Sequence, residues 1–314
     1  MSTLTFIFII SGIVLIILSA QKLEKYSVLT ASKYGMSPFL IGSTVIAFGT
    51  SAPEMFTSLF ATIDGKALMV VGNVVGSNVA NIALVFGLTL GVLFFKKENF
   101  TSGPETSLNL IILIISTFIV CGVMVVNPFS IYSSLFLLLS LIVVILIWYK
   151  KNTGVPVEID ETKENFLLTK LFLSIASLVL AAWLITKGAL NVLDSFGINE
   201  LFVGYTVLAI GTSLPEIAAS LALALKGRYS AVAGTLIGSN ILNGLFVLAI
   251  PGLFRSSSSF DYIQWIPLQI LLIIVTIFFS IYVFIRIKKP KRASLMVSFF
   301  FFISYLVSLS LAYN

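Results

Sequence analysis

Two short blocks of this sequence, 162 residues apart, carry the same chemically capable side chains. The first block reads GTSAPE at 49–54 and GSNVAN at 76–81, and the second reads GTSLPE at 211–216 and GSNILN at 238–243. Each block places one glutamate, Glu54 or Glu216, inside a long apolar stretch. An ionisable side chain within an apolar segment is costly enough that a functional role is the default interpretation. Hydroxyls and amides flank both glutamates, so the chemistry to expect is coordination through oxygen.

Helical spacing gathers these side chains on one face of each segment. Residues three, four and seven positions apart form one stripe of a helix, and residues four apart share a face. The first block supplies Ala47, Thr50, Ser51 and Glu54 on one segment and Ser77 and Asn81 on the next, and the second supplies Ala209, Thr212, Ser213, Glu216, Ser239 and Asn243. Two such faces offer two carboxylates, six hydroxyls and two amide oxygens.

Prolines add backbone ligands to this inventory. Pro53 and Pro215 have no N–H and crowd the preceding turn, so carbonyls around Gly49 and Gly211 lose their helical partners and become available. A donor set made of oxygen suits Ca²⁺, which takes six to eight oxygen ligands, and also Na⁺. Softer transition metals are disfavoured without nitrogen or sulfur ligands. Two glutamates match the charge of one Ca²⁺, and protons are natural competitors for two nearby carboxylates.

Other repeated polar and small residues have structural interpretations. Serines and threonines in membrane helices often bond to their own backbone, and glycines often mark close helix packing. We expect packing for Ser58, Ser220, Gly72, Gly76, Gly234 and Gly238, and ion contact for the hydroxyls that share a stripe with a glutamate. Asn78 and Asn240 point off the ligand stripe, so interhelical hydrogen bonding and ligation both stay open. Thr235 stands where the first block has Asn73, a difference the sequence does not explain.

The composition of the chain indicates whether these blocks lie in water or in a membrane. The 314 residues are 58% hydrophobic and 10% charged, with a mean hydropathy of +1.09, which is typical of a polytopic membrane protein. The net charge of +6 is scattered in short clusters, so nucleic acid is not an expected partner. No histidine is present, which excludes Ser-His and Cys-His catalysis, and the single cysteine, Cys121, excludes an intramolecular disulfide. We expect a protein that is not an enzyme and needs no cofactor.

Apolar runs long enough to cross about 30 Å of hydrocarbon predict ten membrane helices. They lie near 4–20, 38–62, 68–95, 107–126, 130–149, 167–188, 200–225, 230–253, 263–285 and 293–311. The first run resembles a signal peptide at Leu18-Ser19-Ala20, but no positive residue precedes its apolar core, so we expect a retained helix.

Basic residues predict the orientation. With ten spans, sixteen Lys and Arg residues fall on one side, which the positive-inside rule assigns to the cytoplasm, and three fall on the other. The sixteen are Lys22, Lys25, Lys33, Lys96, Lys97, Lys150, Lys151, Lys163, Lys170, Lys226, Arg228, Arg286, Lys288, Lys289, Lys291 and Arg292, and the three are Lys66, Lys187 and Arg255. Both termini are therefore expected outside, in a cytoplasmic membrane of prokaryotic type.

The duplication predicts the architecture. A repeat of five helices at 1–149 and another at 167–314 are joined by a short polar linker at 150–166, expected on the cytoplasmic side. Because five is odd, the second repeat must enter the membrane from the opposite side. The fold is thus expected to be an all-α integral membrane protein of two inverted five-helix repeats, with one substrate site near the midplane where interrupted helices meet.

The paired G-T-S-x-P-E and G-S-N-x-x-N blocks resemble the alpha repeats of sodium/calcium exchangers in the cation/calcium exchanger superfamily. This resemblance implies that Glu54 and Glu216 are shared Ca²⁺ and Na⁺ ligands. It further implies outer sodium sites, formed by Thr50, Ser51, Thr212, Ser213 and the carbonyls of Ala47 and Ala209. The middle and inner ion sites would be lined by Ser77, Ser239, Asn81 and Asn243.

The resemblance also implies a mechanism. Ca²⁺ or several Na⁺ would occupy one oxygen cage, and the first helix of each half would slide to alternate access; more than two Na⁺ per Ca²⁺ would make exchange electrogenic. Asn243 replaces an aspartate found in potassium-dependent relatives, which favours exchange without K⁺. A proton/calcium antiporter is the alternative, a cation channel is the rival from another class, and an intramembrane protease is disfavoured. A monomer in the lipid bilayer is the working expectation.

Overall fold

The structure, a computed structural model, describes residues 3–33, 37–150, 165–196, 199–254, 262–288 and 294–313, and these are almost entirely helical. Ten helical segments in this part of the chain are long and apolar enough to cross a membrane, as the sequence predicts. They are Thr5–Ser27, Phe39–Ile63, Ala67–Lys96, Glu105–Val126, Ile131–Lys150, Leu167–Val192, Glu200–Leu225, Tyr229–Leu253, Trp265–Lys288 and Leu295–Tyr313.

Several of these spans are built from more than one helical element. The first half contains α1 (Thr3–Lys33), α2 (Pro38–Ile41), the π-helix η1 (Gly42–Ile46), α3 (Ala47–Thr50), α4 (Ala52–Ile63), α5 (Ala67–Val79), the π-helix η2 (Ala80–Val85), α6 (Phe86–Lys96), α7 (Glu105–Val126) and α8 (Ile131–Lys150). The second half contains α9 (Leu167–Phe196), α10 (Glu200–Val203), the π-helix η3 (Gly204–Leu208), α11 (Ala209–Thr212), α12 (Leu214–Leu225), α13 (Tyr229–Leu245), the 3₁₀-helix η4 (Val247–Ala249), α14 (Ile250–Leu253), α15 (Tyr262–Lys288) and α16 (Leu295–Tyr313).

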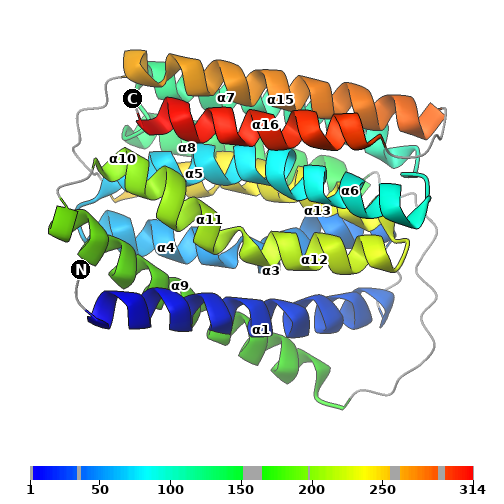
Figure 1. Cartoon of the computed structure of the whole chain (residues 1–314), viewed down its shortest axis with the longest axis horizontal. Helices are drawn as coiled ribbons and strands as arrows, with labels where there is room; N and C mark the ends of the chain where they lie inside the picture. The colour runs from blue at the N-terminus through cyan, green and yellow to red at the C-terminus, as the bar shows by residue number, and fades with distance from the viewer. Residues whose placement is uncertain are drawn as a thin grey trace.

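The two halves are inverted copies of one arrangement. The broken span α2–η1–α3–α4 is repeated by α10–η3–α11–α12, and the two run toward opposite ends of the bundle (Figure 1). The sequence did not predict the π-helices. Two of them fall at equivalent places, η1 at 42–46 and η3 at 204–208, whereas η2 at 80–85 has no π-helical counterpart in the second half. Such π turns inside α-helices are rare and occur frequently at functional sites.

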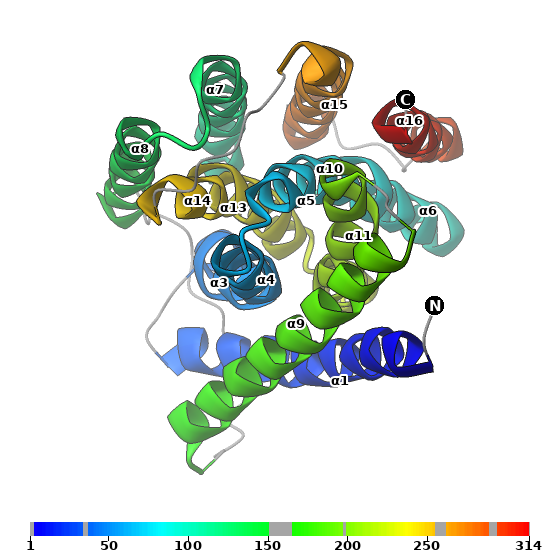
Figure 2. The same cartoon turned by 90° about the vertical axis from the view of Figure 1, so that its left-hand side faces the viewer.

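The first helix of each half is longer than its apolar run predicts. Helix α1 has 31 residues and α9 has 30, against expected spans of 17 and 22 residues. The extensions, such as Gln21–Lys25, contain good helix formers. A tilted helix can also be longer than the membrane is thick, because long basic side chains near its end can reach the membrane–water interface. The two helices cross each other on one side of the bundle, whereas α7, α8, α15 and α16 lie on the opposite side (Figure 2).

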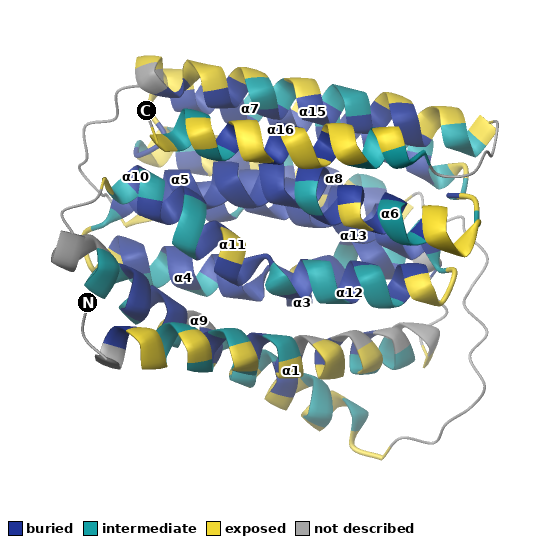
Figure 3. Cartoon of the chain, viewed as in Figure 1, coloured by how far each residue is buried: buried dark blue, intermediate teal, exposed yellow. Residues whose placement is uncertain are grey.

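Burial separates a central layer from the periphery. The span Tyr229–Leu253 is 89% buried and Phe39–Ile63 is 72% buried, whereas Thr5–Ser27 and Leu167–Val192 are each 24% buried. The buried residues concentrate on α5 and α13, and exposed ones on α1 and α16 (Figure 3). The spans that carry the two sequence blocks therefore form the interior, and the long first helices lie outside them.

Reciprocal crossings hold the two repeats together. Helix α13 packs against α2 and η1, and α5 packs in the same way against α10 and η3. A Cβ placed on Gly42 would lie 2.3 Å from the Ala231 carbonyl oxygen, and one on Gly204 would lie 2.2 Å from that of Met69. Glycine at both positions lets the backbones approach where another residue would not fit. The same close approach occurs at Gly72, Gly234, Gly76 and Gly238, which supports the expected packing role.

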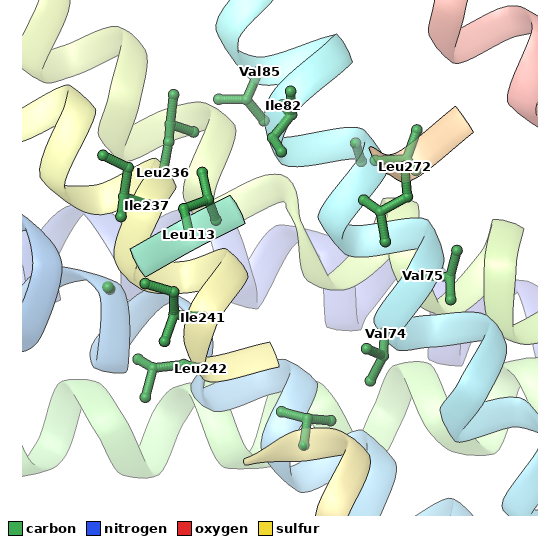
Figure 4. Close-up of a cluster of buried hydrophobic side chains, with 14 of the residues drawn as sticks. Val74, Val75, Ile82, Val85, Leu113, Leu236, Ile237, Ile241, Leu242 and Leu272 are labelled. Carbon is green, nitrogen blue, oxygen red and sulfur yellow. The ribbon is translucent and has the colours of Figure 1, made fainter. Parts of the chain in front are cut away.

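Apolar side chains enclose the polar stripes of the central helices. Val74 and Val75 of α5 lie in one buried cluster with Leu236 and Ile241 of α13, and Leu113 of α7 covers it (Figure 4). All five are at most 3% exposed. Oxygen atoms between α5 and α13 are therefore shielded from lipid by packed hydrocarbon.

Both termini lie at the same end of the bundle (Figure 1), which an even number of spans requires. Most of the linker predicted at 150–166 falls outside the described residues, as do the predicted cytoplasmic Lys151, Lys163, Lys289, Lys291 and Arg292 and the predicted outer Arg255.

At the end shared by the termini, Lys187 pairs with Asp64 at 3.1 Å and Lys66 pairs with Glu200 at 3.3 Å. Each pair joins one repeat to the other.

The crossing at Gly204 supplies a test of the packing. Gly204→Val should lower the thermal unfolding temperature of the purified protein and the yield of monodisperse material, because the new side chain would collide with the backbone of α5. Overpacking typically costs about 1–3 kcal/mol. Gly122→Val on α7 is the control, since a Cβ there has no neighbour within 4 Å. Equal melting of both variants would contradict the proposed crossing.

Candidate cation-binding site

Breaks in two helices position the two buried glutamates. Helix α3 ends at Thr50 and α4 begins at Ala52, with Ser51 between them at φ −81° and ψ 0°; Ser213 makes the same break at φ −79° and ψ 0°. A proline follows near the start of each new helix, as the sequence predicts. Glu54 and Glu216 thus lie in the first turns of α4 and α12, where the positive end of the helix dipole favours a carboxylate.

Both glutamate side chains are fully buried, at 0% exposure. Within the described part of the chain neither forms an ion pair with Lys or Arg, and the two carboxylates interact electrostatically with each other. Removing two like charges from water without a cationic partner is strongly unfavourable. The site therefore requires a positive charge of its own, from metal cations or protons.

Each glutamate is held by hydroxyls of the opposite repeat. Ser51 donates to Oε1 of Glu216 at 3.1 Å, and Ser213 lies 3.5 Å from Oε1 of Glu54 in the mirror-related contact. This exchange of partners brings the two sequence blocks, 162 residues apart, into one site.

The threonine hydroxyls differ from the serine hydroxyls in where they donate. Thr50 Oγ1 donates to the Ile46 carbonyl at 3.0 Å, and Thr212 Oγ1 donates to that of Leu208 at 2.9 Å. These are the back-bonds common for threonine in helices, and they leave the oxygen lone pairs free to meet a cation. The carbonyls of Ala47 and Ala209 each accept the N–H four residues on, at 2.9 and 3.0 Å. The Ala47 carbonyl also lies 3.4 Å from the Thr50 hydroxyl, and the role predicted for both carbonyls stays a prediction.

Ser77 and Ser239 meet different partners. Ser239 lies 3.4 Å from Oε1 of Glu216, whereas Ser77 lies 3.4 Å from Oδ1 of Asn73. Asn73 also donates to Ser58 at 3.2 Å and lies 3.5 Å from the Thr212 hydroxyl. Sequence reasoning did not select Asn73 for the site. The available signal was its spacing, because Asn73, Ser77 and Asn81 lie four residues apart on one helical face.

Asn81 and Asn243 carry polar atoms without partners. Both side chains are 0% exposed, and neither the oxygen nor the nitrogen of either amide has a hydrogen-bond partner in the described residues. The same is true of Oε2 in Glu54 and in Glu216. Buried polar groups are nearly always paired, so unpaired ones require an explanation such as a bound ion. Four such oxygens, two of them anionic, fit a hard cation.

Asn78 and Asn240 have a structural role. Asn78 Nδ2 donates to the Asn240 carbonyl at 3.3 Å, and Asn240 Nδ2 donates to the Leu236 carbonyl at 2.7 Å. Both amides therefore tie α5 to α13 or stabilise α13 itself. The Asn78 contact is interhelical and the Asn240 contact lies within α13. Oδ1 of each amide is buried without a hydrogen-bond partner in the described residues, so ligation by these oxygens stays open.

Thiolate and imidazole chemistry does not fit this arrangement. The chain has no histidine, Cys121 lies buried on α7, and no cluster of three or more His, Cys, Asp or Glu occurs among the residues with described positions. The donors present are carboxylate, hydroxyl, amide and carbonyl oxygens. Alkali and alkaline-earth cations are the ions that such donors select.

A family model described as sodium/calcium exchanger protein matches residues 4–150 and again 166–314. The sequence is 33% identical to a putative antiporter, CaxA, of Alkalimonas amylolytica over 78% of this chain and 79% of that protein. It is 27% identical to the sodium/calcium exchanger MaX1 of Methanosarcina acetivorans over 98% and 99%. It is 25% identical to the Ca²⁺/H⁺ antiporter ChaA of Bacillus subtilis over 67% and 66%.

A solved structure of the sodium-calcium exchanger NCX_Mj, soaked with Na⁺ and Sr²⁺, is similar throughout. It superposes with a TM-score of 0.74 at 25% identity and covers 99% of both chains. The match supports the ten-helix architecture of two inverted repeats.

Replacing either glutamate by glutamine tests the site. Glu54→Gln and Glu216→Gln keep the side-chain shape but remove one of two negative charges. Each should weaken Ca²⁺ binding to the purified protein at least about 100-fold, since a charge contact at about 4 Å contributes about 4 kcal/mol at an effective dielectric of about 20. Isothermal titration calorimetry measures the change.

Glu200→Gln is the matched control for these variants. Glu200 also lies in the first turn of a helix, but its side chain is 26% exposed and pairs with Lys66. Its variant should bind Ca²⁺ as the unmodified protein does. Wild-type affinity in Glu54→Gln or Glu216→Gln would overturn the assignment of these residues.

Proposed function

The chain belongs to the sodium/calcium exchanger protein family, and from that premise we propose that it is a Ca²⁺ antiporter that exchanges Na⁺ for Ca²⁺ across a membrane by alternating access. The observation that carries the proposal is the group of buried oxygens without hydrogen-bond partners on Glu54, Glu216, Asn81 and Asn243. These atoms come from both repeats and suit a hard cation.

Charge matching favours competition between the two ions at one site. Two carboxylates neutralise one Ca²⁺ or two Na⁺, and the amides of Asn81 and Asn243 add dipoles without charge. A loaded, neutral cage can pass between the two sides at much lower cost than an unloaded one, because a net buried charge is expensive in the membrane. Coupling then follows from the requirement that some cation be bound when access changes.

A third Na⁺ per cycle would make the exchange electrogenic. The hydroxyls of Ser51, Ser213, Ser77 and Ser239 supply oxygens beyond those that one Ca²⁺ requires. Each net charge moved would then gain or lose about 2.3 kcal/mol per 100 mV of membrane potential.

Helices α1 and α9 are the proposed moving elements. They pack against each other, and α1 also packs against α12 while α9 packs against α4. They therefore contact the helices that carry Glu216 and Glu54 from outside the central layer. A cavity of ≈ 400 Å³ lies among α1, α3, α8, α9 and α13, with apolar lining that includes Leu23, Gly49 and Leu171. This space allows the first helices to shift without compressing the core.

The proposed organisation keeps the sequence-based boundaries and orientation. The repeats are 1–149 and 167–314 with the linker 150–166 between them, and the positive-inside rule supports a cytoplasmic linker and external termini. We take the protein to act as a monomer, because both halves of the site come from one chain.

Proton-coupled Ca²⁺ transport is the second candidate, since the two buried carboxylates could load protons and the relative ChaA is named for that exchange. A channel is disfavoured because the helices at the site are interrupted and inverted, an architecture typical of alternating-access transporters.

Ca²⁺ uptake into proteoliposomes distinguishes these candidates. Outward gradients of Na⁺, H⁺ and K⁺ are imposed in turn, and ⁴⁵Ca²⁺ accumulation is measured. We expect uptake with the Na⁺ gradient and none with K⁺ alone, and none in Glu54→Gln or Glu216→Gln proteoliposomes. Uptake driven by H⁺ and not by Na⁺ would favour the second candidate, and uncoupled flux with large conductance would favour a channel.

Asn243→Asp tests the charge of the proposed cage. A third buried carboxylate must be neutralised by a proton or an additional cation, so Ca²⁺ uptake should fall more steeply with decreasing pH than in the unmodified protein. Initial uptake rates between about pH 8 and pH 6 measure this slope. Asn81→Asp, at the symmetry-related position, should behave alike. Unchanged pH profiles in both variants would contradict a shared cage of two carboxylates.

A further inference from the structure

The two halves differ at several buried positions, and at one of them a side chain of the first half bonds directly to hydroxyls of the site. Asn73 on α5 and Thr235 on α13 are equivalent residues, each one helical turn before the serine of its block, Ser77 or Ser239. All four side chains are 0% exposed. The backbones around them match closely, since a Cβ on Gly76 would lie 2.7 Å from the Ala209 Cβ and one on Gly238 would lie 2.8 Å from the Ala47 Cβ. The difference is therefore one of side-chain chemistry.

In the first repeat the Asn73 amide organises three hydroxyls. Its Nδ2 donates to Ser58 at 3.2 Å, which sets the orientation of the amide. Its Oδ1 then faces the hydroxyls of Ser77 at 3.4 Å and Thr212 at 3.5 Å. Thr212 belongs to the opposite repeat and directly precedes Ser213, which lies 3.5 Å from Glu54. One amide thus connects α4, α5 and α11.

In the second repeat the equivalent network is missing. Within the described residues, Thr235 Oγ1 and Ser220 Oγ have no hydrogen-bond partner. A threonine hydroxyl is one atom on a short stem, so it cannot bridge as an amide does. Ser239 is directed instead at Glu216, at 3.4 Å. The neighbouring apolar residues Leu236 and Ile237, at 0% exposure, keep this region shielded from lipid (Figure 4).

The consequence concerns the single proton of each serine. Ser77 directs its proton to Asn73, so its lone pairs can face a cation beside Glu54. Ser239 directs its proton to Glu216, which uses an acceptor on that carboxylate and turns the hydrogen toward the place where a cation would bind. A cation on the Glu216 side must therefore reorient Ser239 as well as Ser51, whereas on the Glu54 side only Ser213 directs its proton at the carboxylate. Preorganised ligands bind more tightly because the ordering cost is met in advance.

We propose that Asn73 is a positioning residue that prepares the Glu54 half of the site for cations, and that Thr235 leaves the Glu216 half weaker. The inference rests on the proposed function, because it assumes that both halves receive transported cations. Since the pseudo-two-fold axis exchanges the two sides of the membrane, unequal halves give the exchanger unequal Na⁺ affinities at its two faces.

Single substitutions test the proposal on the full-length purified protein by calorimetric titration with Na⁺ and with Ca²⁺. Asn73→Thr should weaken binding about fivefold, the effect of one lost hydrogen bond of typical strength. Thr235→Asn should tighten it, because the new amide can accept from Ser239 and donate to Ser220. A purely structural role for position 235 predicts no tightening, so unchanged or weaker binding in well-folded Thr235→Asn protein would overturn the proposal.

The double exchange Asn73→Thr with Thr235→Asn is the decisive variant. In vesicles of uniform orientation, apparent Na⁺ affinity is measured separately from the inside and the outside by inhibition of ⁴⁵Ca²⁺ flux. The exchange should reverse which face has the higher affinity while keeping the overall flux. Preserved sidedness would refute the inference. Failure of the proposed function is a different result, in which the unmodified protein itself has no Na⁺-sensitive Ca²⁺ flux.

Discussion

The burial of two carboxylates without a basic partner is the constraint on which the rest of the structure depends. Glu54 and Glu216 are fully enclosed, and the residues with described positions offer them hydroxyls and helix N-termini but no cationic side chain. Such an arrangement is stable only if cations or protons complete it. The helix breaks at Ser51 and Ser213 lie three residues before these two groups, and the π-helices η1 and η3 lie earlier in the same broken spans. The fold thus concentrates its irregular backbone where charge must be accommodated.

Reciprocal packing turns two half-sites into one. Glycines at Gly42 and Gly204 let each repeat's broken helix approach a helix of the other repeat to backbone contact. That approach delivers Ser51 to Glu216 and Ser213 to Glu54. Each glutamate therefore receives a hydroxyl contact from the opposite repeat, and Glu216 receives a further one from Ser239 of its own repeat. The long helices α1 and α9 contribute little to this interior and pack across it from one side, which suits elements that move while the cage keeps its shape.

Near symmetry makes small differences informative. Where both halves share a residue, the contacts are repeated, as for Ser51 and Ser213. Where they differ, at Asn73 and Thr235, the hydrogen bonds diverge over three neighbouring hydroxyls. An exchanger with identical halves would treat its two faces alike. A single amide is enough to make the two faces unequal without changing a residue that carries charge.

The sequence by itself determined the ten spans, their duplication and inversion, and the helix interruptions that the prolines cause near Gly49 and Gly211, and it predicted two glutamates surrounded by oxygen ligands. These follow from hydrophobic length, odd helix number and proline chemistry, which are properties local to the chain. Only the tertiary structure decided which hydroxyl meets which carboxylate, that Thr50 and Thr212 donate to their own helices, that Asn78 serves packing, and that Asn73 belongs to the site. The contacts between helices depend on the close crossing of segments about 160 residues apart in the chain, and no spacing rule specifies which side chains meet there.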